Sequence, residues 1–155
     1  MKTTFVLKKF FIFVILIALS ACSAGGKTPT LSPTEGVQML AGVYTTSIKD
    51  EDISKVNSLE PNFSVNQGEW KITFTNDGNF TAEKDGEFIA NGSFNVTGNK
   101  IEVGVDQVCP NCSCSGTIGR YYWALKDNQL SFSKIAGVCD AMDLVMTSHA
   151  ITRQP

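Results

Sequence analysis

The central part of the chain alternates between apolar and polar residues with a period of two. Trp70, Ile72 and Phe74 occupy every second position of one segment, and polar residues stand between them. Alternate side chains of a β-strand point to opposite faces, so this spacing places three large apolar groups on one face. Asp77 and Gly78 follow, a pair that tolerates positive φ and marks a tight hairpin turn. The segment therefore predicts a half-buried strand that ends in a turn.

The same pattern recurs along most of the chain, and turn-forming pairs of Asp, Asn and Gly separate the apolar segments. The strands that we expect cover residues 39–46, 70–75, 80–83, 88–96, 101–105, 120–125, 130–133 and 144–153. A short helical turn is predicted within residues 50–59. About eight short strands joined by tight turns predict an all-β fold, an antiparallel meander that is closed into a barrel or folded as a sandwich.

The first residues follow a different pattern. Lysines flank a run of apolar residues at positions 10–18, and small residues come after it. A basic start, a short apolar middle and a small-residue end are typical of a secretory signal, and the run is too short to span a bilayer, which takes about 20 residues. We therefore predict that residues 1–21 form a signal peptide.

This leader ends at Leu19, Ser20, Ala21 and Cys22, a sequence that resembles the lipobox of bacterial lipoproteins. The resemblance implies cleavage before Cys22 and acylation of both its thiol and its new amino terminus. Two or three acyl chains anchor a protein stably to a membrane. We therefore expect a palmitate-type lipid anchor at Cys22 in the bacterial cell envelope, on the extracytoplasmic side, and on the outer membrane where the cell has two.

The residues after the leader are small, polar and interrupted by proline, and they contain too little apolar surface to order themselves. Residues 22–35 are therefore predicted to form the lipidated N-terminus and a flexible tether, and residues 36–155 the β domain. The chain has 13 Lys and Arg against 15 Asp and Glu; loss of the leader removes three lysines and leaves ten against 15, a net charge of −5. An acidic domain does not attract nucleic acid, so we expect no nucleic-acid partner.

From Leu40 to Pro155 the order of the segments resembles bacterial lipocalin-like proteins of the calycin type. The matching segments are LAGVYT at 40–45, WKITFTNDGNF at 70–80, YWALKDNQLSF at 122–132, and the end of the chain. Lipocalins place Gly-x-Trp in the first strand and a basic residue of the last strand across that ring. Here Tyr44 replaces the tryptophan and Arg153 is the basic partner. The resemblance implies a lipocalin-like barrel that Tyr44 and Arg153 close, and carriage of a small apolar molecule.

A barrel of about eight strands has an interior that is filled by side chains or that holds one small ligand. The residues expected to line a ligand site are Trp70, Ile72, Phe74, Phe80, Phe88, Ala90, Phe94, Val103, Trp123 and Met146. The same residues would equally fill a closed core, and the pattern alone leaves both alternatives open.

Four cysteines remain once Cys22 carries lipid, and an even number outside the cytoplasm favours disulfides. Four cysteines allow three pairings, and the sequence favours Cys114 with Cys139, which closes a loop of about 25 residues and stabilises by roughly 3 kcal/mol. Cys109 and Cys112 would pair locally. The alternatives are a zinc or copper(I) site built from the four thiolates and a redox-active CxxC motif. We expect no metal and no cofactor.

His149 is the single histidine, and the chain contains no nucleophile motif to accompany it, so we expect no enzyme activity. Two functions remain. The first is a lipid-anchored barrel that binds a small apolar or amphipathic ligand. The alternative is a surface interaction or inhibitor protein with a filled core that acts through a disulfide-stiffened loop at residues 106–119, toward a protein partner that the sequence does not identify. An apolar cavity would favour the first function and a packed interior the second.

Overall fold

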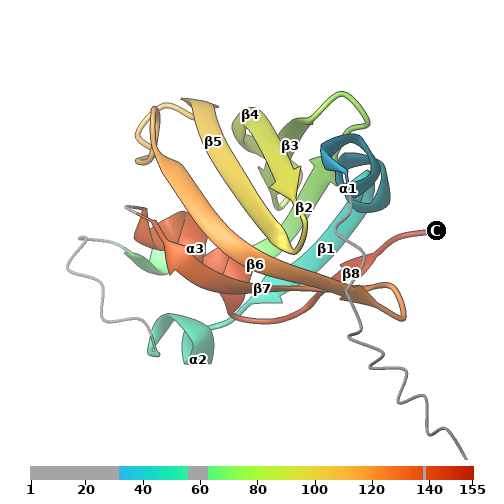
Figure 1. Cartoon of the computed structure of the whole chain (residues 1–155). Helices are drawn as coiled ribbons and strands as arrows, with labels where there is room; N and C mark the ends of the chain where they lie inside the picture. Colours follow the sequence, from blue (N-terminus) through green and yellow to red (C-terminus); the bar gives the residue numbers. More distant parts are fainter. Residues whose placement is uncertain (1–31, 56–62, 138) are drawn as a thin grey trace, which may run out of the picture.

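The computed structural model describes residues 32–55, 63–137 and 139–155, and within them the backbone forms a closed antiparallel barrel (Figure 1). The strands follow one another around the barrel in sequence order. They are β1 (Gly42–Ile48), β2 (Gly68–Phe74), β3 (Asn79–Lys84), β4 (Glu87–Thr97), β5 (Lys100–Val108), β6 (Ile118–Lys126), β7 (Gln129–Ala136) and β8 (Ile151–Arg153). The predicted all-β fold, the antiparallel order and the closed barrel are confirmed. The predicted signal peptide and Cys22 lie outside the described residues.

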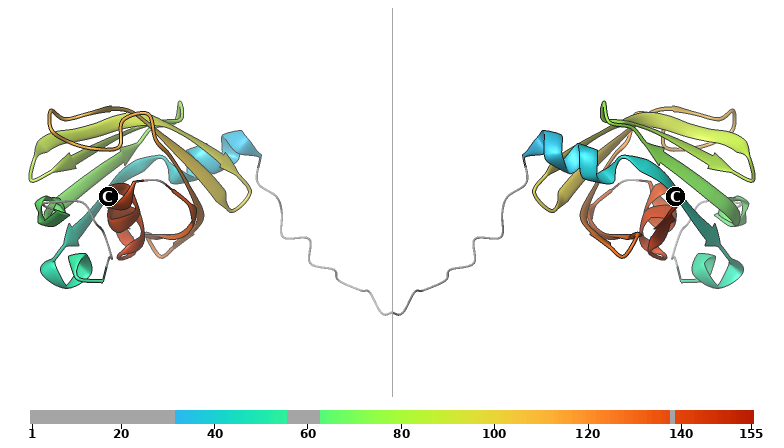
Figure 2. Two further views of the ribbon diagram at one scale, coloured as in Figure 1. Left: turned by 90° about the vertical axis from the view of Figure 1, so that its left-hand side faces the viewer. Right: turned by 90° about the vertical axis from the view of Figure 1, so that its right-hand side faces the viewer.

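In the described part of the chain, four helical segments accompany the barrel: α1 (Pro33–Leu40), α2 (Asp50–Ile53), the 3₁₀ helix η1 (Phe63–Asn66) and α3 (Asp140–Thr147). Helix α3, dark red in Figure 2, packs on β7. None of the described helices is long and apolar enough to cross a membrane.

Helix α1 corrects the expected boundary of the tether, and it also takes two residues from the expected first strand. The Ser32 hydroxyl accepts a hydrogen bond from the Glu35 N–H, and the Glu35 carboxylate accepts one from the Ser32 N–H, so the two form a capping box. Pro33 occupies the first helical position, where its missing N–H is harmless. The tether was therefore predicted too long. Ser32, Pro33 and Glu35 have the composition of a linker, but in this order they also form the start of a helix.

Strand β8 closes the barrel over a short stretch. It pairs with β1 at Tyr44 and Thr45, and with β7 at Gln129 and Leu130. Next to these pairs the Arg153 guanidinium lies 5.7 Å from the centre of the Tyr44 ring and donates to the Ala41 carbonyl. The predicted contact between Tyr44 and Arg153 is therefore present, and a cation–π contact of this kind is worth about 0.5–2 kcal/mol.

The segment before β8 is a helix and not the strand that we expected over residues 144–153. The Cys139 Sγ accepts a hydrogen bond from the Met142 N–H at the start of the helix. Asp140 and Asp143 lie in the first turn, where their negative charges interact favourably with the positive end of the helix dipole. Leu144, Val145 and Met146 are buried, and their consecutive apolar run resembles a buried strand in sequence. Because α3 packs on β7, it occupies the part of the wall that β8 is too short to fill.

A bulge in β4 corrects the predicted side of Phe88. Ala82 pairs with Ala90, whereas the next residue, Glu83, pairs with Phe88, so Ile89 is the extra residue. Because of this insertion, the alternation reverses there. Phe88 is 46% exposed, and Ile89 is turned inward instead.

One end of the barrel is filled by aromatic side chains. The Phe74 ring packs edge-on against Tyr44 and Phe94, with ring centres 5.9 and 5.0 Å apart. Trp123 is buried at the same end and its Nε1 donates to the Gly98 carbonyl. The Tyr44 hydroxyl donates a hydrogen bond to the Leu40 carbonyl at the end of α1. The interior beyond Phe74 is not filled in this way.

Candidate ligand-binding cavity

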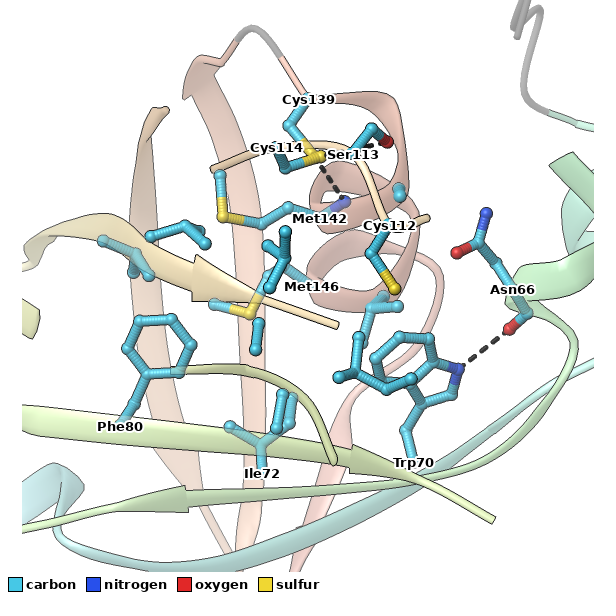
Figure 3. Close-up of a pocket in the computed structure, with 18 of the residues that line it drawn as sticks. Asn66, Trp70, Ile72, Phe80, Cys112, Ser113, Cys114, Cys139, Met142 and Met146 are labelled. Carbon is cyan, nitrogen blue, oxygen red and sulfur yellow. Dashed lines mark hydrogen bonds between the residues drawn. A yellow bond between two sulfur atoms is a disulfide. The ribbon is translucent and has the colours of Figure 1, made fainter. Parts of the chain in front are cut away.

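The other half of the barrel holds a cavity of about 640 Å³ (Figure 3). Strands β2 to β5 form one side of it and α3 forms the other, while η1 and the loop between β5 and β6 lie at its mouth. Small-molecule sites typically have volumes of about 300–1,000 Å³ and mostly apolar walls. The cavity is thus large enough for one small ligand.

The deep part of the cavity has an apolar surface. Phe74 and Phe80 lie at its inner end, next to the packed aromatic cluster, and Met142 and Met146 reach in from α3. Methionine side chains are flexible and polarisable, so they adapt to ligands of irregular shape. This part of the cavity can accept an apolar body and offers it little to hydrogen-bond.

Trp70 marks the border between the apolar interior and the mouth. The indole is 6% exposed, and its Nε1 donates to the backbone carbonyl of Asn66 at 2.8 Å. Asn66 in turn donates its side-chain amide to the Phe63 carbonyl. The bond from Trp70 holds η1 over the mouth, and the bond from Asn66 lies within η1. Because the single donor of the indole is already used, the ring offers a ligand only an apolar surface.

The loop at the mouth covers residues 109–117, since β5 extends to Val108 and β6 begins at Ile118. It is therefore shorter than the predicted loop of residues 106–119. Both predicted cysteine pairs are at disulfide distance, with Cα atoms 5.2 Å apart for Cys109 and Cys112 and 5.5 Å apart for Cys114 and Cys139. The second pair ties this loop to the start of α3. The pairing leaves none of these four thiolates for the zinc or copper alternative.

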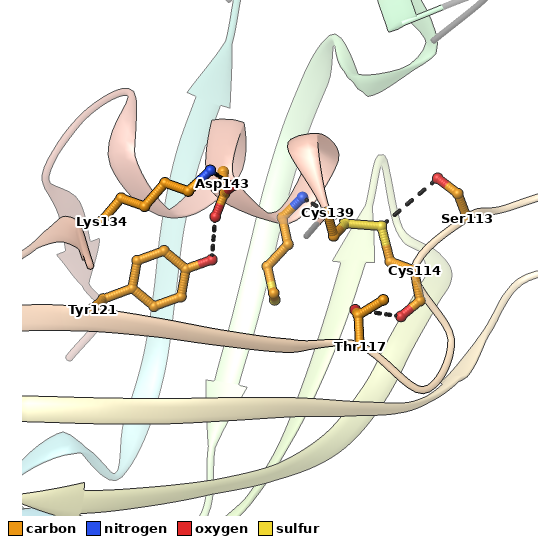
Figure 4. Close-up of a disulfide and its surroundings, with 8 residues drawn as sticks. Ser113, Cys114, Thr117, Tyr121, Lys134, Cys139 and Asp143 are labelled. Atoms are coloured by element: carbon orange, nitrogen blue, oxygen red, sulfur yellow. Dashed lines mark hydrogen bonds and ion pairs between the residues drawn. A yellow bond between two sulfur atoms is a disulfide. The ribbon is translucent and has the colours of Figure 1, made fainter. Parts of the chain in front are cut away.

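A polar cluster of buried Tyr121, buried Asp143 and exposed Lys134 fixes α3 against the barrel wall (Figure 4). The Tyr121 hydroxyl, on β6, donates to Asp143 Oδ1 at 2.7 Å, and Lys134 of β7 pairs with Asp143 Oδ2. Burial and the neighbouring carboxylate raise the pKa of Tyr121 far above its ordinary value. The phenol therefore stays protonated, and its role here is to hold the helix that lines the cavity.

A second polar contact joins α2 to the connection between α3 and β8. His149 Nε2 lies 2.9 Å from Asp52 Oδ1, and Asp52 is 1% exposed. Burial alone would raise the pKa of Asp52, but hydrogen bonds from His149, the Lys49 N–H and Lys55 outweigh it and lower the pKa to about 2. Asp52 is thus a structural anion, and His149 is its partner.

The structure brings together seven of the ten residues predicted to line a ligand site. These are Trp70, Ile72, Phe74, Phe80, Ala90, Val103 and Met146. Phe94 and Trp123 are buried in the packed end, and Phe88 lies on the outside. The inward faces of β2, β3 and β5 are thus as the alternation predicts. Phe88 lies outside because of the bulge, whereas Phe94 and Trp123 point inward at the end of the barrel that side chains fill.

Other residues of the wall were missed. Val105 continues the alternation of Val103 and could have been included from the sequence. Ile89 required the bulge, and Phe63, Met142 and Val145 required helices that bring distant segments to the barrel. No local pattern in the sequence signals those contributions.

Comparison with protein-family models, curated proteins and solved structures finds no match for this chain. Within residues 32–55, 63–137 and 139–155, no three His, Cys, Asp or Glu side chains come together in a way that could hold a metal ion. A function for this protein therefore has to be inferred from the barrel and its cavity.

Proposed function

We propose that this protein is a lipid-anchored, non-enzymatic binder of a small apolar or amphipathic molecule, which it holds inside the barrel. The observation that carries the proposal is the 640 Å³ apolar cavity at one end of an otherwise packed barrel. Burial of apolar surface is worth about 25 cal/mol per Å², so an apolar molecule gains from entering such a cavity. A filled interior would have favoured the alternative.

The walls are also built in a way that supports a preformed site. The disulfide between Cys114 and Cys139, together with the Tyr121–Asp143–Lys134 cluster, attaches α3 to the loop, β6 and β7. A cavity whose walls are already ordered loses less conformational entropy when a ligand binds. Binding then requires little rearrangement of the barrel.

The experiment compares two alanines on strands. Ala90→Trp fills the cavity, whereas Ala124→Trp places the same side chain on the exposed face of β6. Binding of the neutral fluorescent probe N-phenyl-1-naphthylamine is measured on the disulfide-intact domain, and circular dichroism checks folding. We expect the wild type and Ala124→Trp to bind and Ala90→Trp to lose at least ten-fold in affinity. Ala90→Leu with Ala124→Leu repeats the comparison if Ala90→Trp does not fold.

A wild-type protein that binds no neutral apolar probe, and that carries no apolar molecule on native mass spectrometry, would overturn the binding proposal. The interaction function through the loop at 109–117 would then be the better supported of the two.

The lipid anchor is proposed from the sequence LSAC at positions 19–22. Its test is independent of the cavity. Expression of the full chain in a bacterium with radiolabelled palmitate should label the wild type, and Cys22→Ser should abolish the label. Ser23→Ala, a neighbouring change outside the acylated position, serves as the control. Equal labelling of Cys22→Ser and the wild type would contradict the anchor.

A further inference from the structure

The residues that line the cavity carry no charge, and this limits the kinds of ligand that the cavity can bind. No lining residue in the described part of the chain is Asp, Glu, Lys or Arg. The polar side chains among them are Asn66, Asn111 and Ser113, and all three are at the mouth. A cavity of this size therefore combines an uncharged interior with neutral hydrogen-bonding groups at one end only.

None of the lysines and arginines in the described part of the chain lines the cavity, and several of them form ion pairs elsewhere. Lys71 pairs with Glu83 at 2.6 Å, and Arg120 pairs with Glu102 at 2.7 Å, both outside the cavity. Lys84 pairs with Asp85 at the outer end of the β3–β4 hairpin. Among the described residues, a carboxylate that entered the cavity would therefore find no lining cation with which to pair.

The energetic consequence is large, because moving an unpaired ionised group out of water is strongly unfavourable. The same holds for an ammonium group, since no carboxylate lines the cavity in the described chain. The faces of Trp70, Phe74 and Phe80 attract a cation only weakly in comparison with this cost. The interior therefore disfavours both signs of charge.

The mouth of the cavity, in contrast to its interior, favours a neutral polar group on the ligand. Asparagine amides and serine hydroxyls both donate and accept hydrogen bonds, so they fit a hydroxyl, carbonyl, ester or amide equally well. Asn66 comes from η1, whereas Asn111 and Ser113 come from the loop, so neutral groups from two segments surround the opening. A ligand with one neutral polar end would satisfy these groups while its body stays in the apolar part.

We propose that the cavity selects uncharged amphiphiles, which lie with the apolar body against Trp70 and Met146 and keep a neutral hydrogen-bonding end among Asn66, Asn111 and Ser113. This inference rests on the proposed ligand-binding function and names its ligand class. Free fatty acids in their ionised form and cationic amphiphiles are discriminated against.

The test uses three probes with the same twelve-carbon chain: 1-dodecanol, dodecanoate and dodecyltrimethylammonium, each below its micellar concentration. Each displaces N-phenyl-1-naphthylamine from the disulfide-intact domain at pH 8. We expect the Kd of dodecanol to be at least ten-fold lower than that of either ion. The Kd of dodecanoate should fall toward that of dodecanol as the pH drops through the pKa of the dodecanoate carboxyl group, whereas the Kd of dodecanol stays constant.

A pair of variants on η1 tests the position of the polar end. Asn66→Lys places a cation at the mouth, and Ser64→Lys places one on an exposed residue of the same helix that does not line the cavity. We expect Asn66→Lys to lower the ratio of the dodecanoate Kd to the dodecanol Kd at pH 8 by about ten-fold or more, because the new cation pairs with the carboxylate alone. Ser64→Lys should leave the ratio of the two Kd values as in the wild type.

Dodecanoate or the ammonium probe binding as tightly as dodecanol at pH 8 would overturn the ligand class while leaving the binding function intact. Equal ratios in Asn66→Lys and Ser64→Lys would overturn the placement of the polar end. A protein that binds neither the fluorescent probe nor any of the three amphiphiles would instead overturn the binding function itself.

Discussion

At the scale of single residues, Gly92 on β4 and Gly104 on β5 have very different surroundings. A Cβ atom added to Gly92 would lie 2.0 Å from the Gly104 carbonyl oxygen and 2.9 Å from the Phe80 ring. A Cβ atom on Gly104 would meet its nearest neighbour at 3.8 Å, an ordinary contact. Two glycines on paired strands thus serve different purposes, and only the first is required for close approach of the backbones.

We predict that Gly92→Ala destabilises the domain by about 2–3 kcal/mol or more, because the clash is with backbone that cannot turn aside. Gly104→Ala should be neutral or slightly stabilising, since alanine lowers the entropy of the unfolded chain. Urea unfolding of both variants measures the difference. Equal stabilities would mean that β4 and β5 are further apart than the structure shows.

Asp52 gives the domain a pH dependence at acid pH. Its pKa is lowered from 3.8 to about 2 in the folded state, so the folded protein holds the anion more strongly than the unfolded chain does. This contribution to stability is fully present above the unfolded pKa and is lost as the pH falls from about 4 to about 2. We predict that Asp52→Asn lowers the free energy of unfolding at pH 6 by an amount on the order of 1 kcal/mol.

The measurement is urea unfolding of the wild type and Asp52→Asn at pH 6 and near pH 2. The gap between them should shrink at the lower pH, where the wild-type carboxyl is also losing its charge. Asp50→Asn, on the same short helix and exposed, is the control and should change little at either pH. A gap that is constant over the whole range would contradict the role of the Asp52 anion.

At the scale of elements, α3 depends on contacts distant in sequence. Its first turn is covalently tied to the mouth loop by Cys114 and Cys139, which are separated by 25 residues, while Cys109 and Cys112 close a turn with a separation of three. Cross-links that close longer loops remove more entropy from the unfolded chain. The two disulfides should therefore differ in their effects on both stability and binding.

We predict that replacing Cys114 and Cys139 by serine lowers stability by about 3 kcal/mol and weakens binding of neutral amphiphiles, because the loop and α3 both line the cavity. The double serine variant at Cys109 and Cys112 is the matched control and should lose less of both. Thermal unfolding and probe titration on the two variants give the comparison. A greater loss in the control would show that the local turn matters more than the anchoring of α3.

At the scale of the whole molecule, binding and folding are coupled, because a ligand that occupies the cavity binds only the folded barrel. A free ligand concentration 100 times the Kd stabilises by about 2.7 kcal/mol. We predict that dodecanol raises the Tm of the wild type and of Ala124→Trp by several degrees and leaves that of Ala90→Trp unchanged. Differential scanning calorimetry with and without ligand measures the shift. A rise in Ala90→Trp equal to that of the wild type would place the ligand outside the cavity.

The strands and turns of this protein were predictable because their causes are local. Alternation at Trp70, Ile72 and Phe74 requires only neighbours in sequence, and Asp85, Asp127 and Asn128 adopt the positive φ that turn-forming residues tolerate. The disulfide pairing could also be predicted, because the sequence separations of the cysteines favoured it. The number and order of the strands followed from these local signals together with the short connections.

The sequence by itself therefore determined the antiparallel order of the strands and most of the inward face, and it favoured the cysteine pairs that are present. Tertiary structure alone decided the closure of the barrel, the bulge at Ile89, the helical state of residues 140–147 and the existence of the cavity. The physical reason is that each of these depends on how distant segments pack: the apolar run at 144–146 is equally suited to a strand or a helix. It became a helix where β8 is too short to fill the wall, and the space that this packing leaves unfilled is the candidate site.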